Sequence, residues 1–157
     1  MIKMKIPVVI LFCILIFNGL VYSQNKVEAD IGLGLFEGIS LKVKYGNNVQ
    51  VALCQGFAQR SFWMTGIEGY YHFAGVSKHL DQRTFYVMTG LSSTLFAGGY
   101  DSFEKIIWYS RLGKTFNFSG KSGLNIDVGA GILSADDIDG YHSSMVPTFG
   151  IHYFRRF

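Results

Sequence analysis

The stretch YHSSM holds the residues of this chain that are best suited to catalysis, because it places His142 two residues before Ser144. At that spacing an imidazole can activate a hydroxyl as a nucleophile when an acidic side chain orients the ring. No Asp or Glu follows His142 in the sequence, and the surrounding Asp, Gly and Ser residues predict a loop. We therefore expect no catalytic pair here, and the sequence predicts a protein that is not an enzyme.

Calcium binding is the second chemistry to consider, in the acidic stretch ADDIDG. Asp137, Asp139 and Gly140 match positions 3, 5 and 6 of an EF-hand loop. Ala135 and Val146 then occupy positions 1 and 12, where that loop requires acidic ligands. The stretch is better interpreted as a solvated surface loop, and no calcium site is expected.

Other cofactors find no support in the residue pattern. The glycine-rich stretches GLGLFEG and GAG lack the dinucleotide-binding fingerprint and a following helix. The four histidines show no close ligand spacing with Cys54, so we expect no structural zinc. These histidines are His72, His79, His142 and His152.

The N-terminal residues have the pattern of an export signal. Two lysines in MIKMK precede ten unbroken apolar residues, VVILFCILIF, and Val21 and Ser23 are small residues suited to the −3 and −1 positions of a cleavage site. The sequence thus predicts a signal peptide over residues 1–23, with a mature chain over residues 24–157 that forms one domain. The alternative is an uncleaved anchor helix over residues 6–22, although Pro7 and Asn18 interrupt it.

Composition of the expected mature chain excludes two further classes. Loss of Lys3 and Lys5 leaves 12 basic against 11 acidic residues, a net charge of +1 that gives no reason to expect a nucleic-acid partner. Cys54 is then the one remaining cysteine, so no intramolecular disulfide can form. Stability must come from the fold itself.

Apolar residues alternate with polar or small ones along the chain, which predicts β-strands with one apolar face. The pattern is clearest over residues 124–132, where Leu124, Ile126, Val128 and Ile132 face one way and Asn125 and Asp127 the other. Eight antiparallel strands in meander order are expected, and Gly-, Asn-, Asp- and Ser-rich connections separate them. The predicted strands cover residues 29–36, 39–45, 49–57, 61–73, 84–97, 105–117, 123–133 and 145–157.

The last predicted strand carries a resemblance to a known family. Together with the predicted signal peptide and eight alternating strands, PTFGIHYFRRF resembles the closing strand of small outer-membrane β-barrel proteins of Gram-negative bacteria. The resemblance implies a closed, porin-like, antiparallel up-and-down transmembrane β-barrel in the outer membrane. It also implies a monomer in contact with lipid and lipopolysaccharide. In that family apolar residues alternate back from a terminal Phe and form a signal that the barrel-assembly machinery reads. The matching residues are Phe149, Ile151, Tyr153 and Phe157, whereas Arg155 departs from the pattern.

An eight-stranded barrel has an interior that side chains can fill, so a wide pore is not expected. A lumen plugged by paired charges is favoured over a narrow ion path. With a periplasmic N-terminus, the outer connections are FEGI, AQRS, AGGYDSFE and SADDIDGYHSSM, and AGVSKHLDQR becomes a long inner turn. The side chains expected inside are Lys42, Lys44, Glu68, His72, Arg111, Asp127, His152 and Arg156.

The favoured function is therefore that of a structural or interaction protein without catalysis. One alternative is a soluble periplasmic ligand-binding barrel similar to lipocalins, in which Leu124, Ile126 and Val128 face a ligand or core instead of lipid. The other is a membrane acyl hydrolase: the His142 and Ser144 spacing is similar to that of lipid A deacylases, although the residues that flank this pair in that family are missing.

Overall fold

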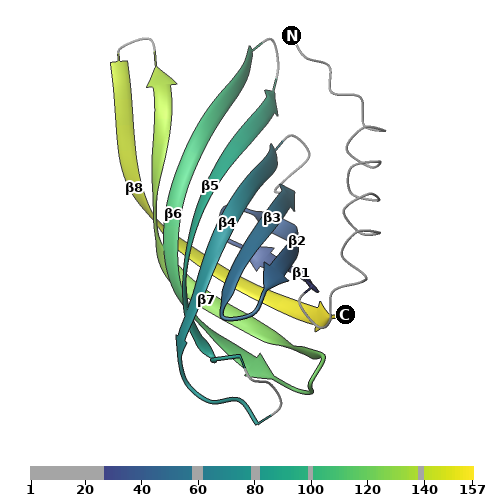
Figure 1. Ribbon diagram of the computed structural model, residues 1–157. Helices are drawn as coiled ribbons and strands as arrows, with labels where there is room; N and C mark the ends of the chain where they lie inside the picture. The colour runs from purple at the N-terminus through teal and green to yellow at the C-terminus, as the bar shows by residue number, and fades with distance from the viewer. Residues whose placement is uncertain (1–26, 58–61, 79–81, 99–100, 138–139) are drawn as a thin grey trace.

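The computed structural model describes residues 27–57, 62–78, 82–98, 101–137 and 140–157. The predicted signal peptide and Gln24 lie outside these ranges. Eight β-strands form a closed barrel (Figure 1). They are β1 (Val27–Gly34), β2 (Gly38–Gly46), β3 (Val49–Phe57), β4 (Phe62–Ala74), β5 (Phe85–Gly98), β6 (Asp101–Asn117), β7 (Ser122–Asp137) and β8 (Gly140–Arg156). Among the described residues, no helix has the length and apolarity needed to cross a membrane.

Each strand pairs antiparallel with its neighbour in the sequence, and β1 pairs with β8 to close the barrel. At this seam Ile31 lies opposite Tyr153, and the Phe157 N–H donates to the Val27 carbonyl at 3.0 Å. Over the length of β1, this pairing joins the first and last strands and removes both sheet edges. The predicted all-β, up-and-down barrel of eight strands is confirmed.

Two of the predicted outer loops are wrong. Most of SADDIDGYHSSM is strand, because β7 runs to Asp137 and β8 starts at Gly140. Likewise β6 starts at Asp101, inside AGGYDSFE. Asp, Ser and Gly are depleted in isolated strands, but here each backbone pairs across a hairpin, as in Ala135 opposite His142, and the ladder outweighs the local preference.

The strands differ in length around the barrel, as Figure 1 shows. β1, β2 and β3 have 8, 9 and 9 residues, whereas β6, β7 and β8 have 17, 16 and 17. One side of the wall is therefore about half as long as the other. The ladders of β6, β7 and β8 continue past the end of the short side.

Side chains alternate between the two faces of the barrel wall, as period-two geometry requires. Val128 is 63% exposed, whereas its neighbour Asp127 is buried. Ile132 is also exposed, Leu124 and Ile126 are half-buried, and Asn125 is buried. The predicted alternation over residues 124–132 is confirmed, with the apolar side facing out.

A small cluster of aromatic and aliphatic side chains fills part of the interior, including Tyr70, Tyr86 and Tyr109. Glycines on the adjacent strands make room for two of these rings. The ring of Tyr86 lies across Gly113, and the ring of Tyr109 lies across Gly90, where an added Cβ would meet the ring carbon Cζ at 2.6 Å. These positions need a residue without a side chain.

Candidate functional site

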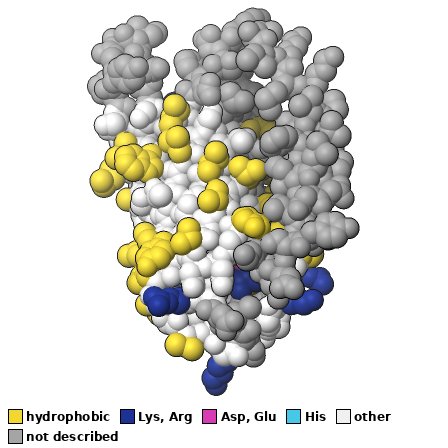
Figure 2. Space-filling model, in the orientation of Figure 1, with side chains coloured by type: hydrophobic (Ala, Val, Ile, Leu, Met, Phe, Trp, Pro, Cys, Tyr) yellow, Lys and Arg dark blue, Asp and Glu magenta, His cyan; other side chains and the backbone are white. Residues whose placement is uncertain are grey.

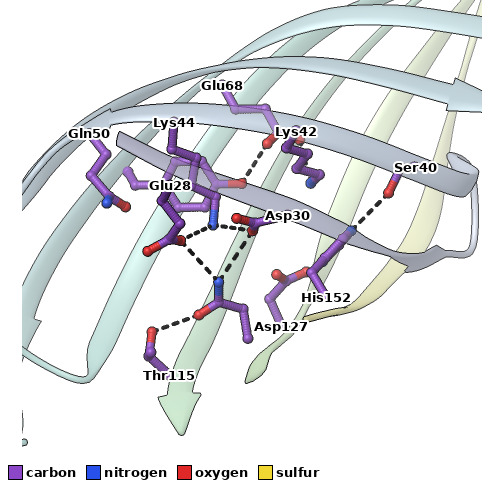
Figure 3. Close-up of polar contacts among 12 residues, drawn as sticks. Glu28, Asp30, Ser40, Lys42, Lys44, Gln50, Glu68, Thr115, Asp127 and His152 are labelled. Carbon is purple, nitrogen blue, oxygen red and sulfur yellow. Dashed lines mark hydrogen bonds and ion pairs between the residues drawn. The ribbon is translucent and has the colours of Figure 1, made fainter. Parts of the chain in front are cut away.

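The barrel interior holds the chemistry of this chain, since nine of the charged side chains that the structure describes are buried there. β1, β2, β4, β6, β7 and β8 supply eight of them, and the β1–β2 turn supplies Glu37. Figure 3 shows several of these side chains pointing toward one another beneath the β1 and β2 ribbons. The nine are Glu28, Asp30, Glu37, Lys42, Lys44, Glu68, Arg111, Asp127 and Arg156.

Five of these residues form a chain of alternating charge, here called the Glu37 cluster: Glu68, Lys42, Glu37, Arg111 and Asp127. Lys42 Nζ lies 2.8 Å from Glu68 Oε1 and 3.5 Å from Glu37 Oε1. Arg111 Nη1 lies 2.8 Å from Glu37 Oε1 and 3.2 Å from Asp127 Oδ1. Each cation thus bridges two carboxylates across the lumen.

Tyrosine hydroxyls complete the Glu37 cluster at both ends. Tyr70 and Tyr109 donate to the two oxygens of Glu68, the second at 2.7 Å, and Tyr86 donates to Asp127 Oδ2 at 2.8 Å. Hydrogen bonds to a charged acceptor are stronger than neutral ones. The tyrosines therefore hold both terminal carboxylates in place.

A second group, here called the Glu28 cluster, comprises Glu28, Asp30, Lys44, Arg156 and Asn125. Lys44 Nζ lies 3.0 Å from Glu28 Oε1 and also pairs with Asp30 Oδ2, and Arg156 Nε lies 2.7 Å from Glu28 Oε2. The Asn125 amide donates to both carboxylates, at 3.4 and 3.3 Å. Because β1, β2, β7 and β8 all contribute, this cluster ties the closing seam together. Figure 3 shows the contacts of Lys44 with Glu28 and Asp30.

Burying charges in this way is costly unless each is paired. The nine buried residues comprise five acids and four bases, so opposite charges almost balance. The two clusters pair every one of the nine with at least one opposite charge. The interior is therefore a set of cross-strand ion pairs, which links strands that are distant in sequence.

Two histidines are also buried, but separately. His72 contacts the Arg83 carbonyl through Nδ1 at 2.8 Å and the Gln50 amide oxygen through Nε2 at 3.1 Å. His152 Nε2 lies 3.0 Å from Ser40 Oγ. Within the part of the chain that the structure describes, no three His, Cys, Asp or Glu side chains are grouped to hold a metal ion.

All eight residues expected inside the barrel are buried there, which confirms their predicted facing. Glu28, Asp30 and Glu37 are also buried there and were not predicted from the sequence. The alternation along the first strand indicates that Glu28 and Asp30 face inward. Asp30 alternates with Ala29 and Ile31, which were assigned to the opposite, apolar face. Glu37 lies in a turn, where no periodicity indicates direction.

Three residues of the predicted assembly signal lie on the outer face of β8, and the fourth, Phe157, directly follows that strand. Phe149, Tyr153 and Phe157 are exposed and Ile151 is half-buried. Their role in assembly stays a prediction. Arg155, which departs from the pattern, is exposed on the same face.

The predicted loop around His142 and Ser144 is wrong. Both lie on β8, opposite Ala135 and Leu133 of β7. Ser144 is exposed, and the side chain of His142 lies outside the described ones. Asp137, from the rejected calcium motif, pairs with Gly140 at the hairpin end, and Asp139 lies outside the described residues.

Apolar side chains cover the outer face of the wall, with aromatic rings on either side of an aliphatic middle. On β4, Trp63 and Tyr71 flank Ile67, each four residues away, and all three are more than half exposed. At about 3.4 Å per residue, Ile67 is about 14 Å along the strand from each ring. Figure 2 shows hydrophobic side chains scattered over the height of one face, and Lys and Arg side chains toward its lower end.

Fold and interior together define a class of protein: closed eight-stranded up-and-down β-barrels with an apolar outer face and a charged interior. Among solved structures, the chain is similar to the N-terminal β-barrel domain of Pseudomonas aeruginosa OprF, with a TM-score of 0.52 and 15% sequence identity. The match covers 83% of this chain and 98% of that one. No protein-family model and no curated protein matches the sequence. The similarity shows a shared barrel fold.

Replacing Tyr86 by Phe should destabilise the barrel by about 1–3 kcal/mol, because buried Asp127 would lose a hydrogen bond that water cannot replace. Urea unfolding of the folded protein in detergent would measure the change from the transition midpoint. Tyr153→Phe is the matched control, since that ring lies on the outer face. Equal midpoints for the two variants would show that the Tyr86 hydroxyl does not contribute.

Proposed function

We propose that this chain is an integral outer-membrane β-barrel protein of structural or interaction type, without catalysis, whose lumen is closed by ion-paired side chains. One observation carries the proposal: the polarity of the two faces is reversed relative to a water-soluble barrel. The exposed face bears residues such as Leu41, Leu53, Ile67 and Val128, whereas all nine charges described above are buried. Apolar-out and polar-in alternation is typical of membrane barrels.

The same observation disfavours the lipocalin-like alternative. A soluble ligand-binding barrel would direct Leu124, Ile126 and Val128 into its cavity and polar residues to water. Here these residues face outward, and Lys42, Glu68 and Arg111 face inward. Among the described side chains, the interior presents ion-paired charges beside a small aromatic and aliphatic cluster, whereas small-molecule sites are lined mostly by apolar groups.

Closure of the lumen is supported by the size of what lies inside. Arg111, Tyr86, Lys42, Phe154 and Met64 are among the largest fully buried side chains. Both ion-pair clusters cross the lumen between strands, and eight strands enclose only enough space for side chains. We therefore expect no stable ion conductance.

The proposed assembly signal is formed by Phe149, Ile151 and Tyr153 on the outer face of β8 and by Phe157, which directly follows that strand. Its support is the row of apolar residues at alternate positions near the end of the chain, which only Arg155 interrupts, beside the seam that closes the barrel. The proposed contacts are outer-membrane lipid and lipopolysaccharide around the apolar belt and the barrel-assembly machinery during biogenesis. The barrel is proposed to be a monomer, since β1 pairs with β8 and the chain closes its own sheet.

Fractionation of Gram-negative cells that express the full chain tests the proposed location. We expect the protein in the outer-membrane fraction, with a gel mobility in detergent that changes on boiling, because a closed barrel resists the detergent until heated. Recovery in the soluble periplasmic fraction would contradict the membrane proposal. Purified barrel added to a planar bilayer then tests closure: steady single-channel steps would show an open path.

A further inference from the structure

Exposed charge on this barrel is unevenly distributed by sign and by position. Among side chains that the structure describes, every Asp and Glu is buried, and every fully exposed charge is Lys or Arg. All of these exposed cations lie at the barrel end that carries the β2–β3, β4–β5 and β6–β7 connections, here called the basic end. They are Lys78, Arg83, Lys114, Lys121 and Arg155.

Two of these lysines line a groove at the basic end. It has a volume of about 530 Å³ and lies between the β4–β5 connection and the end of β6. Its lining includes Lys78 and Lys114, the rings of Phe85, Phe116 and Phe118, and Val76. None of the described lining residues is acidic.

The groove is held in a defined shape by contacts between its two walls. Asn117 Nδ2 donates to Ser77 Oγ at 2.8 Å, and the Thr115 N–H donates to the Thr84 carbonyl at 2.7 Å. Lys114 Nζ lies 4.9 Å from the centre of the Phe85 ring and 5.1 Å from that of Phe116. The ammonium group is thus positioned between two rings that are part of the apolar outer face.

The lining combines the two features that an amphiphilic anion requires. Val76 is 95% exposed and Phe118 is 62% exposed, so apolar surface is presented beside the two cations. An inorganic anion would use only the lysines, whereas a lipid would also cover the rings. Basic residues beside a membrane-embedded apolar surface are typical of sites for anionic lipid headgroups.

We propose that this groove binds an anionic phospholipid, with its phosphate between Lys78 and Lys114 and its acyl chains along the phenylalanine rings. The proposal rests on the membrane location proposed above. Because the exposed cations among the described side chains gather at the basic end, that end is the one proposed to contact an anionic leaflet. The groove then orients the barrel in the membrane as well as binding one lipid molecule.

Native mass spectrometry of the full-length protein, extracted in non-ionic detergent, tests the site with added phosphatidylglycerol or phosphatidylcholine. Each lysine near an anionic lipid contributes about 1 kcal/mol, so Lys78→Gln with Lys114→Gln should weaken phosphatidylglycerol binding by about 30-fold. Lys121→Gln is the matched control, an exposed lysine at the same end that does not line the groove. It should bind within about twofold of the unmodified protein.

Heat-dependent gel mobility first establishes that each variant folds. If the double variant does not fold, Lys78→Gln and Lys114→Gln are tested separately. Each should lower phosphatidylglycerol affinity by about fivefold. A membrane-inserted barrel that binds both lipids equally, or that loses the same affinity through Lys121→Gln, would overturn the lipid site alone. Displacement of the lipid by millimolar inorganic phosphate would also overturn it. A chain that is absent from membranes would overturn the proposed function and the site together.

Discussion

Replacement of Glu68 by Leu should destabilise the barrel by about 3–5 kcal/mol, the cost of removing one partner from a buried ion pair. Lys42 would keep only Glu37, at 3.5 Å, while Tyr70 and Tyr109 would lose their shared acceptor. All of these side chains are buried, so water cannot restore the lost contacts. Urea titration of the folded barrel in detergent, followed by the heat-dependent gel shift, would measure the difference.

Two further variants identify the cause. Glu68→Leu combined with Lys42→Met removes both charges and should recover part of the lost stability, because no unpaired ammonium group remains. Lys121→Met removes an exposed charge and should change stability by less than about 0.5 kcal/mol. If Glu68→Leu were as mild as Lys121→Met, water would have to reach the pair, and the lumen would not be closed.

Replacement of Ile67 by Lys should cost about 2–4 kcal/mol in a membrane and almost nothing in water. Ile67 is 59% exposed and lies midway between Trp63 and Tyr71, where the hydrocarbon core of a bilayer would be. In a membrane the ammonium group would lose its hydration there, whereas on the surface of a soluble barrel it would stay hydrated. The loss of stability on this substitution therefore distinguishes a membrane barrel from a water-soluble one.

Val49→Lys is the matched control for this experiment. Val49 is also exposed and apolar, but it is the first residue of β3, next to the β2–β3 turn. A lysine near the interface costs about 0–1 kcal/mol. Stability is measured by urea unfolding in lipid vesicles. Two equally mild substitutions would contradict a lipid-facing wall.

The sequence predicted the eight strands because alternation is a local signal that the barrel preserves. β3 was placed at residues 49–57, as observed, since Val49, Val51, Leu53 and Phe57 recur with period two and YGNNV ends the preceding strand. The β7–β8 hairpin was not predicted at full length. Asp136 and Asp137 have turn-forming side chains, and only pairing with Tyr141 and Gly140 makes them strand residues.

The sequence predicted most of the charged residues that lie inside the barrel, but not which of them form ion pairs with one another. Alternation along a strand determines which side of the wall each side chain faces, so Lys42, Glu68 and Arg111 were correctly placed inside. Which charge meets which depends on register between strands and on turn conformation. Glu37 shows this limit, because it links Lys42 to Arg111 from a turn whose direction no local pattern encodes.

The seam between β1 and β8 has a consequence for the order in which the barrel forms. The Glu28–Arg156 pair joins residues 128 positions apart, whereas each other neighbouring strand pair meets through a short connection. Loop-closure entropy grows with the logarithm of this separation, so closing the seam costs about 2 kcal/mol more than closing a 10-residue hairpin. Contacts of such high contact order form late and slowly. The hairpins between neighbouring strands should therefore form first. The Glu28 cluster should form last, in the step that closes the open sheet into a barrel.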